Sequence, residues 1–482
     1  MMAQKTDVVI IGAGPVGLMC AYLGRLCNLE VVIIDKSLEP LQVGRADALN
    51  ARTLQLFESV GLFDQLHPLG KPCNTSSVWA DGKFVSRKSA WWDELEGCFH
   101  KYYLMLGQSF VEQALDERIK TLGCPVHRQT SVRDIKILEE GCMTTLSTGE
   151  TIQSEFVIGA DGSRSFVRDW FNVPFEVTYP QLIWAVLDGI VDTDFNKVPE
   201  IIVFQAETSD VAWIPREGEI DRFYVRMDTQ DFTVEQAVAK INRAMAPHTL
   251  RFKELVWSSQ FTVRESVAQH YAIEGKVFIA GDACHIHSVN GGQGLNTGLA
   301  DAFNLMWKMS MVLKHGASKA LLPTYEQERK PVALGVIETS GELVRTTKYS
   351  AQGTHAEDYL KVVERRAGFI TGMGIRYGQH DLDGQRLLDF KLREPVSGEL
   401  TATRIYSLLD YRFFTLLVFG DAPITADLPA YVKQIQINDE SSPYANQLIL
   451  VRPDTYIAAS SALNDLAPIT AYLDSVVYPR TT

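Results

Sequence analysis

The sequence of 482 residues has few cysteines and no closely spaced pair of them. They are scattered, odd in number and without a C-x-x-C spacing: Cys20, Cys27, Cys73, Cys98, Cys124, Cys142 and Cys284. Such a set argues against a disulfide framework and against a zinc site, so we expect no metal centre. Scattered unpaired cysteines are typical of a reducing compartment, and we expect a cytoplasmic protein.

Long apolar runs and a surplus of basic residues are also missing. No stretch reaches the roughly 20 apolar residues of a transmembrane helix, and the first residues lack the pattern of a secretory signal peptide. The formal net charge of −13 argues against nucleic acid or an anionic membrane as the main partner. The composition, 46% hydrophobic and 22% charged, is globular, and the length favours two or three domains.

The first motif present is a nucleotide-binding fingerprint near the N-terminus. An apolar strand leads into Gly-Ala-Gly-Pro-Val-Gly, followed by a helix over residues 18–27 and a second apolar strand. Gly12 suits a tight turn, Gly14 the close approach of a pyrophosphate, and Gly17 close helix–strand packing. Asp35, at the end of the second strand, suits a ribose hydroxyl. The motif predicts a dinucleotide site without separating NAD from FAD.

A second glycine-rich loop lies between an apolar strand over 277–280 and a helical pattern over 297–313. At such a strand–loop–helix junction, backbone N–H groups and the positive end of the helix hold an anion or an electron-rich ring. The acid at the strand end suits ribityl-type hydroxyls, and the glycines let a flat cofactor approach the backbone. An ordinary turn is the alternative. The residues expected at the cofactor are Asp282, Gly294, Leu295 and Asn296.

This loop and its flanks, Ala283-Cys-His-Ile-His and Asp301-Ala-Phe-Asn-Leu-Met-Trp-Lys, resemble the Gly-Asp motif of group A FAD-dependent aromatic monooxygenases. The likeness is to their phenol hydroxylase branch, which includes fungal enzymes of secondary metabolism. Gly-Ala-Asp161-Gly-Ser-Arg-Ser-Phe-Val-Arg resembles the family's Asp-Gly motif, associated with FAD and with the pyrophosphate of NADPH. Gln108 matches a glutamine near the flavin, with a plain helix-start residue as the alternative.

The stretch from Gly44 to Arg52 resembles the family segment that brings an arginine to FAD and an aspartate toward the substrate. Arg45 and Asp47 match those positions, and we expect the stretch to open a helix. For Asp47, the alternative is an acid in the first helical turn, where the dipole favours it. Alternation in residues 222–227 places Tyr224 on a face that excludes Phe223. Tyr224 is therefore a candidate site residue, with a structural role as the alternative.

The resemblance implies an α/β protein with a Rossmann-type, p-hydroxybenzoate hydroxylase-like FAD-binding domain, interleaved with an antiparallel-sheet substrate domain. A thioredoxin-like C-terminal domain without redox cysteines follows. We assign residues 1–75, 101–175 and 266–384 to the first domain, 76–100 and 176–265 to the second, and 385–482 to the third. Within them we expect strands near 125–132, 133–138, 143–146, 183–190, 201–205, 211–214 and 222–227.

The family's chemistry implies tightly held FAD, NADPH as a transient co-substrate, and oxygen transfer from a flavin C4a-hydroperoxide to an electron-rich aromatic substrate. Asp47 would accept a proton or hydrogen bond from a phenol O–H or an indole N–H. One departure is Val289, which stands where the family usually has proline. It keeps open a second reaction, epoxidation of an indole alkaloid followed by rearrangement to a spirooxindole.

Rivals of other classes have less support. A flavin halogenase would carry Trp-x-Trp-x-Ile-Pro, of which only Trp213-Ile-Pro is present, and a plain NAD dehydrogenase would lack the segments of Asp161 and Asp282. A non-catalytic flavin-binding module is the remaining alternative. The expected partners are a small aromatic molecule, O2 and NADPH, with no nucleic acid and no membrane span, in a monomer or homodimer.

Overall fold

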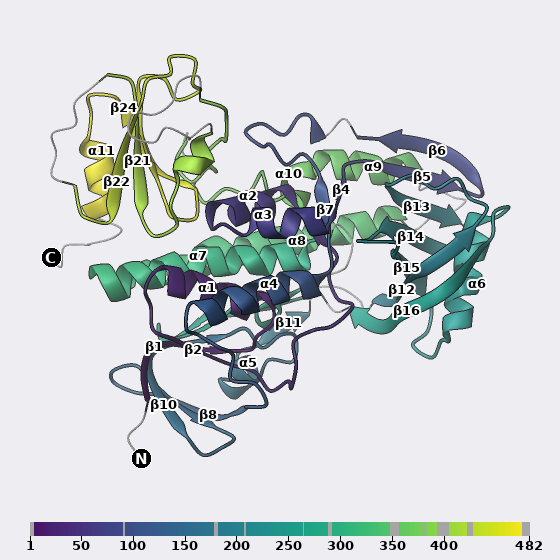
Figure 1. The fold of residues 1–482 in the computed structure, drawn as a ribbon, viewed down its shortest axis with the longest axis horizontal. Helices are drawn as coiled ribbons and strands as arrows, with labels where there is room; N and C mark the ends of the chain where they lie inside the picture. The colour runs from purple at the N-terminus through teal and green to yellow at the C-terminus, as the bar shows by residue number, and fades with distance from the viewer. Residues whose placement is uncertain are drawn as a thin grey trace.

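Figure 1 shows the computed structural model, which describes residues 4–89, 92–177, 182–206, 209–263, 265–287, 292–347, 356–378, 382–392, 404–421 and 428–474. The long helices lie at the centre of this view, with a mixed sheet below them, a second sheet at the right and a C-terminal sheet at the upper left. The expected α/β class is confirmed. None of the described helices is long and apolar enough to cross a membrane.

The mixed sheet has the order β18-β19-β10-β1-β2, with β9 and β8 added beside β10. Four of its strands are parallel, and their continuous apolar runs are buried, as strands covered on both faces require. Helix α1 packs against β1, β2, α4 and α7. The bounds are β1 (Gln4–Ile11), β2 (Val31–Ile34), β8 (Val132–Ile137), β9 (Cys142–Leu146), β10 (Thr151–Gly159), β18 (Ala272–Ile273), β19 (Val277–Ile279), α1 (Pro15–Leu26), α4 (Gln108–Thr121) and α7 (Gly294–His315).

The strand expected near residues 125–132 is wrong. This segment makes a single parallel bridge, between Ile34 and His127, and regular pairing begins only at Val132. Gln129 has a φ of 54°, a left-handed conformation that interrupts an extended chain. Its local sequence carries no glycine or asparagine to announce that turn.

The second sheet has the order β16-β12-β15-β14-β13-β5-β6. All four strands expected between residues 183 and 227 are confirmed, and the aromatic hairpin of β5 and β6 joins them because β5 pairs with β13. Helix α6 covers one face, where Phe223 and Val225 enter a buried apolar cluster. The bounds are β5 (Ser76–Ala80), β6 (Lys83–Lys88), β12 (Leu182–Thr193), β13 (Ile201–Ala206), β14 (Ser209–Pro215), β15 (Asp221–Met227), α6 (Val234–Met245) and β16 (Leu250–Val263).

The segment between the two sheets departs from expectation at residues 44–52. It forms the short strand β3 first, and α2 begins only at Ala51, where Asn50 caps it by accepting a hydrogen bond from Thr53 N (3.0 Å). Other elements around the centre are β3 (Ala48–Leu49), α2 (Ala51–Ser59), α3 (Phe63–Leu66), β4 (Lys71–Cys73), β7 (Tyr103–Met105), α5 (Phe166–Trp170), β11 (Phe175–Val177), β17 (Ser266–Ala268), β20 (His285–Ile286), α8 (Thr324–Thr347), α9 (Ala356–Arg365) and α10 (Ala367–Ile370).

The C-terminal unit, by which we mean residues 404–421 and 428–474, holds a sheet of order β22-β21-β23-β24. Its bounds are β21 (Phe414–Phe419), β22 (Val432–Ile437), β23 (Gln447–Val451), β24 (Ile457–Ala462) and α11 (Ala467–Tyr472). The thioredoxin-like assignment of this unit stays a prediction. Apolar residues of β21 and β23 belong to the same buried cluster as those of α1 and α7, so the unit shares a core with the first sheet.

Candidate cofactor and substrate site

In the N-terminal glycine loop, a side chain at either of two glycines would clash with nearby backbone atoms, whereas the space beside the third glycine is open. A Cβ on Gly12 would lie 2.3 Å from Ala160 O, and one on Gly17 would lie 1.9 Å from Gly12 O. Gly12 also has a φ of +104°. A Cβ on Gly14 would meet none of the described atoms within 4 Å. Gly14 is the N-cap of α1, so open space lies where a helix N-terminus favours an anion.

The acids at the ends of β2 and β10 both brace their loops. Asp35 accepts hydrogen bonds from Ala13 N and Ser37 N, each at 2.6 Å, and so fixes the glycine loop. A carboxylate offers about four lone-pair sites, which leaves capacity for a ribose hydroxyl. Asp161 accepts from Ser165 Oγ (2.5 Å) and Val167 N (3.1 Å) at the start of α5, and burial raises its pKa.

Asp282 and Arg45 come from distant parts of the chain to the same place. Asp282 follows β19 and lies deep between protein segments, which raises its pKa, while the charges of His285 and Arg45 oppose that rise. Its side chain nevertheless keeps an exposed surface, as does that of Arg45. Asp282 and Arg45 are thus two accessible groups of opposite charge that influence each other electrostatically. Asp282 lies beside the first glycine loop, because the neighbouring Gly281 packs against Val16 of that loop.

The N-terminus of α7 presents its backbone to the site. The first N–H groups of a helix have no partner within it, and here they belong to Gly294, Leu295 and Asn296. All hydrogen-bonding positions of the Asn296 side-chain amide have protein partners. Its nitrogen donates to Ala48 O (2.9 Å) and Gly292 O (2.7 Å). Its oxygen accepts from Asn50 N (2.9 Å) and Thr53 Oγ1 (2.7 Å). Asn296 can thus serve a cofactor only through its backbone.

Sequence reasoning missed Gln293, which immediately precedes this helix. Its amide is buried, and neither its nitrogen nor its oxygen has a hydrogen-bond partner among the described residues. An amide left unsatisfied costs free energy that a bound group with donors and acceptors would recover. The signal was available, since Gln293 lies within the second glycine-rich loop. Ser288–Gly291 of that loop, including Val289, lie outside the described residues.

Asp47, which immediately precedes β3, is in contact with Tyr224 on β15 of the second sheet. Tyr224 Oη donates to Asp47 Oδ1 at 3.3 Å, and Arg222 Nη1 lies 3.5 Å from Asp47 Oδ2. Asp47 is buried, and its Oδ2 has no hydrogen-bond partner among the described residues. Because α2 starts four residues later, the alternative of a first-turn helix acid is wrong.

Arg222 anchors this pair and was also missed. Its side chain is fully buried and donates to both oxygens of Asp188, each at 2.6 Å, and to the carbonyl of Arg45. Burial, followed by the negative charge of Asp47, raises the pKa of Tyr224 well above its usual value, so the phenol stays protonated and donates. Gln108 touches the same loop by accepting from Ala46 N at 3.4 Å.

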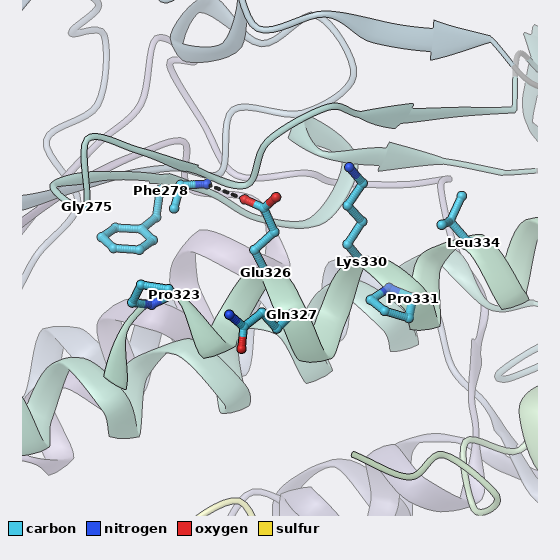
Figure 2. A pocket seen from close by; sticks show the side chains of 9 residues that line it. Gly275, Phe278, Pro323, Glu326, Gln327, Lys330, Pro331 and Leu334 are labelled. Atoms are coloured by element: carbon cyan, nitrogen blue, oxygen red, sulfur yellow. Dashed lines mark hydrogen bonds between the residues drawn. The ribbon is translucent and has the colours of Figure 1, made fainter. Parts of the chain in front are cut away.

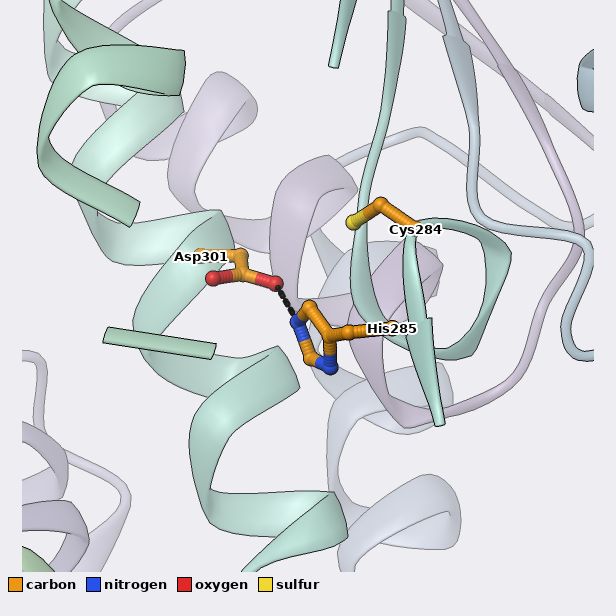
Figure 3. Close-up of side chains that lie close together, drawn as sticks. All are labelled: Cys284, His285 and Asp301. Atoms are coloured by element: carbon orange, nitrogen blue, oxygen red, sulfur yellow. Dashed lines mark hydrogen bonds and ion pairs between the residues drawn. The ribbon is translucent and has the colours of Figure 1, made fainter. Parts of the chain in front are cut away.

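A buried trio of Cys284, His285 and Asp301 lies behind the second glycine loop (Figure 3). His285 Nε2 lies 2.7 Å from Asp301 Oδ2, Gly281 N donates to the same oxygen (3.1 Å), and Arg329 Nε lies 2.7 Å from Oδ1. The guanidinium already balances the carboxylate, and burial raises the pKa of the Cys284 thiol far above its usual value. These contacts favour a brace for the loop over a cation site.

Two hollows lie elsewhere on the molecule. One of about 510 Å³ lies between α8 and the hairpin of β18 and β19, where Phe278, Pro323 and Leu334 line it (Figure 2). Another, of about 240 Å³, lies between α7, α8 and the C-terminal sheet. The acid of the first hollow is held by the protein, because Glu326 accepts from Tyr271 N (2.8 Å). Neither hollow includes a residue expected at the site.

Comparisons with known proteins agree with this geometry. Residues 5–340 match the profile of the FAD binding domain family. Phenol 2-monooxygenase fsqG of Aspergillus fumigatus is 29% identical over 78% of this chain and 66% of its own. The 3-hydroxybenzoate 4-monooxygenase of Comamonas testosteroni is 30% identical over 79% of this chain and 67% of its own. The chain thus spans about two thirds of the length of these two relatives.

Other likenesses cover both partners almost fully. A rifampicin monooxygenase of Rhodococcus hoagii is 30% identical over 94% of this chain and 95% of its own. Among solved structures, the OxyS anhydrotetracycline hydroxylase from Streptomyces rimosus has a TM-score of 0.80 and 25% identity, covering 99% of this chain and 100% of its own. The expected p-hydroxybenzoate hydroxylase-like architecture is thereby confirmed.

Proposed function

We propose, from the premise that this chain belongs to the FAD binding domain family, that it is an FAD-dependent monooxygenase that hydroxylates an electron-rich aromatic substrate at the expense of NADPH. FAD bound at the site supplies the two-electron activation of O2 and delivers one oxygen atom. The printed activities of the phenol and 3-hydroxybenzoate relatives support a phenol-type substrate.

The residues present fit FAD. Open space at Gly14 and the fingerprint acid Asp35 suit the pyrophosphate and the adenosine ribose. The unsatisfied amide of Gln293 and the free N–H groups at the start of α7 suit the polar edge of a flavin ring. Asp282 and Arg45 suit the ribityl chain and the phosphates that connect these two ends. Asp161 holds the loop beneath them.

One observation carries the proposed reaction: Asp47 and Tyr224 meet at 3.3 Å beside the loop that holds Arg45. A buried carboxylate with one oxygen that accepts no hydrogen bond from the described residues is suited to accept a hydrogen bond or a proton from a substrate O–H. Tyr224 and Arg222 hold that carboxylate in place from the sheet side. Deprotonating a phenol raises the electron density of its ring, which favours attack on an electrophilic oxygen.

The test is to purify the chain and follow flavin, NADPH and product together. We expect a yellow protein whose NADPH oxidation is stimulated by one class of phenols or salicylates, with a product 16 mass units heavier, as one added oxygen requires. The panel includes indole alkaloids, because oxygenation of those alone would favour the epoxidation alternative. A yellow protein that oxidises NADPH with no member of the panel and forms no product would favour the non-catalytic flavin module.

We also propose the domain assignment and the setting. The two main sheets and the C-terminal sheet support boundaries of 1–75, 101–175 and 266–384, then 76–100 and 176–265, then 385–482. All seven cysteines are free and buried, which supports work in a reducing, cytoplasmic compartment. The partners proposed are the aromatic substrate, O2 and NADPH, in a monomer or homodimer.

A further inference from the structure

Helices α2 and α7 point their N-terminal ends at the site and are both held by one turn of the C-terminal unit. This turn, residues 452–455, we name the Arg452 turn. It is closed by a hydrogen bond from Thr455 N to Arg452 O (2.9 Å), and Asp454 and Thr455 are almost fully buried. In Figure 1, α2 lies between the C-terminal unit and the β12–β16 sheet, and α7 runs below the C-terminal unit.

The contact to α2 runs through Arg52. Its Nη2 donates to Asp454 O (2.9 Å) and to Thr455 Oγ1 (2.7 Å), and its Nη1 donates to Tyr406 Oη (3.0 Å). The guanidinium is buried, and Tyr456 covers it at 4.9 Å from the ring centroid. A buried cation held by neutral acceptors is costly to leave unsatisfied. The loss of one acceptor should therefore move or loosen Arg52.

The contact to α7 uses the side chain of the same aspartate. Trp307 Nε1 donates to Asp454 Oδ2 at 3.1 Å, and Asn304 Nδ2 lies 3.5 Å from that oxygen. Arg452 holds the other side of the turn by pairing with both oxygens of Glu328 on α8, at 2.7 and 2.9 Å. Four consecutive residues thereby join three helices of the FAD-binding part.

The segment between Arg52 and Asp47 transmits this contact to the site. Arg52 lies in the first turn of α2, and Asp47 is only five residues before it. On the other side, the Asn296 side chain holds Ala48 O and Asn50 N, so the segment is also fastened to the N-terminus of α7. The Arg452 turn is therefore one of the contacts that set the position of Asp47 relative to α7, and the Asn296 side chain is another.

We infer that the Arg452 turn is a positioning element of the oxygen-transfer site: by fastening α2 to α7, it sets where Asp47 lies relative to the flavin-side N–H groups of α7. The inference rests on the proposed function. It assigns positioning roles to Arg52, Asp454 and Thr455, none of which contacts the site directly. It also gives the C-terminal unit a part in coupling NADPH oxidation to oxygen transfer, beyond packing.

The chain offers a matched control on the same helix. At the far end of α2, Arg404 of the C-terminal unit pairs with both oxygens of Glu58 (2.9 Å each). This contact also joins the unit to α2, but it lies a turn and a half further from Asp47. If the C-terminal unit only stabilises the packing of α2, loss of the Arg404 contact and loss of the Arg52 contact should affect coupling equally. If the Arg452 turn positions Asp47, only the contact at Arg52 should affect coupling.

The experiment compares holoenzymes carrying Thr455→Val, Thr455→Ser and Arg404→Gln, with Arg52→Lys as a second probe of the turn if Thr455→Val does not fold. We expect Thr455→Val to keep FAD and reduce it with NADPH within about twofold of wild type. Product per NADPH should fall about 10-fold, with hydrogen peroxide in its place, since a displacement near 1 Å costs up to about 10²-fold in rate. Thr455→Ser, which keeps the hydroxyl, and Arg404→Gln should couple normally.

The rate of backbone amide hydrogen exchange in residues 47–53 measures how firmly this segment is held, and it can be measured without enzyme turnover. Exchange there should quicken in Thr455→Val and stay at the wild-type rate in the other two variants. Normal coupling in Thr455→Val, unchanged exchange, or equal uncoupling by Arg404→Gln would each overturn the inference. If wild type itself forms no product, the proposed function fails, and the exchange comparison still decides whether the turn fixes the segment.

Discussion

The Asp47 carboxylate is the group on which the proposed chemistry depends most directly. Asp47→Asn keeps the size and the hydrogen bond from Tyr224 but removes the negative charge. Loss of a positioned base typically costs about 10²–10⁴-fold in rate. We therefore expect FAD binding and NADPH-dependent flavin reduction to persist while product formation falls by that range and hydrogen peroxide appears. Stopped-flow reduction and product analysis measure the two halves separately.

The control for this variant is Asp192→Asn, at a partly exposed acid of β12 that pairs with Arg251 at the surface. It should change neither reduction nor coupling. If Asp47→Asn loses FAD or couples normally, Asp47 is structural and a base must be sought elsewhere on the face of Tyr224.

Asp282 is the acid expected to keep the flavin in place. Its carboxylate is exposed and feels the positive charge of Arg45, and both residues belong to the segments that would hold the ribityl chain. Asp282→Ala should release FAD during purification or gel filtration, measured as flavin absorbance per protein. Glu274→Ala, an exposed change in the hairpin before β19, should retain a full complement. A yellow, active Asp282→Ala protein would contradict the assignment.

At the residue scale, the sequence predicted side chains that lie in motifs and missed those defined by distant contacts. Gly12, Gly14 and Gly17 follow from a local pattern, because the turn that needs them is local. Arg222 could be placed on the face of Tyr224 by alternation, but its bonds to Asp188 depend on strand pairing. The full use of the Asn296 side chain depends on β3 and α2, about 245 residues earlier in the chain, for which no local pattern exists.

At the scale of elements, helices and strands with a regular pattern of apolar residues could be predicted from the sequence. Elements that depend on pairing with distant parts of the chain could not. The parallel strands β1, β2 and β10 follow from continuous apolar runs. Strand β16 was not predicted, although it is 14 residues long, because an edge strand exposed on much of its surface carries no clean alternation. The helix expected from Gly44 began seven residues late, since pairing of β3 with β7 holds the chain extended first.

The packing of α7 on α8 buries a lysine whose protonation should be visible in stability. Burial lowers the pKa of Lys308 from 10.5 to about 8, although Glu328 lies 2.9 Å away. The lysine of the unfolded chain keeps its proton to higher pH than the folded one. Stability should therefore rise between pH 8 and 10.5, by up to about 3 kcal/mol for a shift of this size.

Lys308→Met isolates that contribution. The difference in unfolding free energy between wild type and Lys308→Met, measured by urea denaturation at pH 7.5 and pH 10, should shift in favour of wild type at the higher pH. Lys433→Met is the control, because Lys433 is partly exposed and pairs with Asp410 at the surface of β22. A difference that does not change with pH would show that Lys308 keeps an ordinary pKa.

At the scale of the whole molecule, the apolar cores do not divide as the sheets do. One cluster runs from β1 and α7 into β21 and β23 of the C-terminal unit, whereas the face of the second sheet under α6 has a cluster of its own. Tyr411 Oη donates to Phe303 O (2.8 Å), and Trp307 meets Phe414 at 5.5 Å between ring centroids. The C-terminal unit and the FAD-binding part should therefore unfold together.

Phe414→Ala and Phe223→Ala test this division, because both remove a fully buried phenylalanine but from different clusters. Each should cost about 3–5 kcal/mol within its own cooperative unit. Phe414→Ala should lower the temperature of FAD release together with the main calorimetric transition, since its cluster includes residues of α7, whose N-terminus lies at the proposed flavin site. Phe223→Ala should lower the temperature at which the second sheet unfolds and shift FAD release less. If Phe414→Ala leaves FAD release at the wild-type temperature, the C-terminal unit unfolds independently and the shared core does not act as one unit.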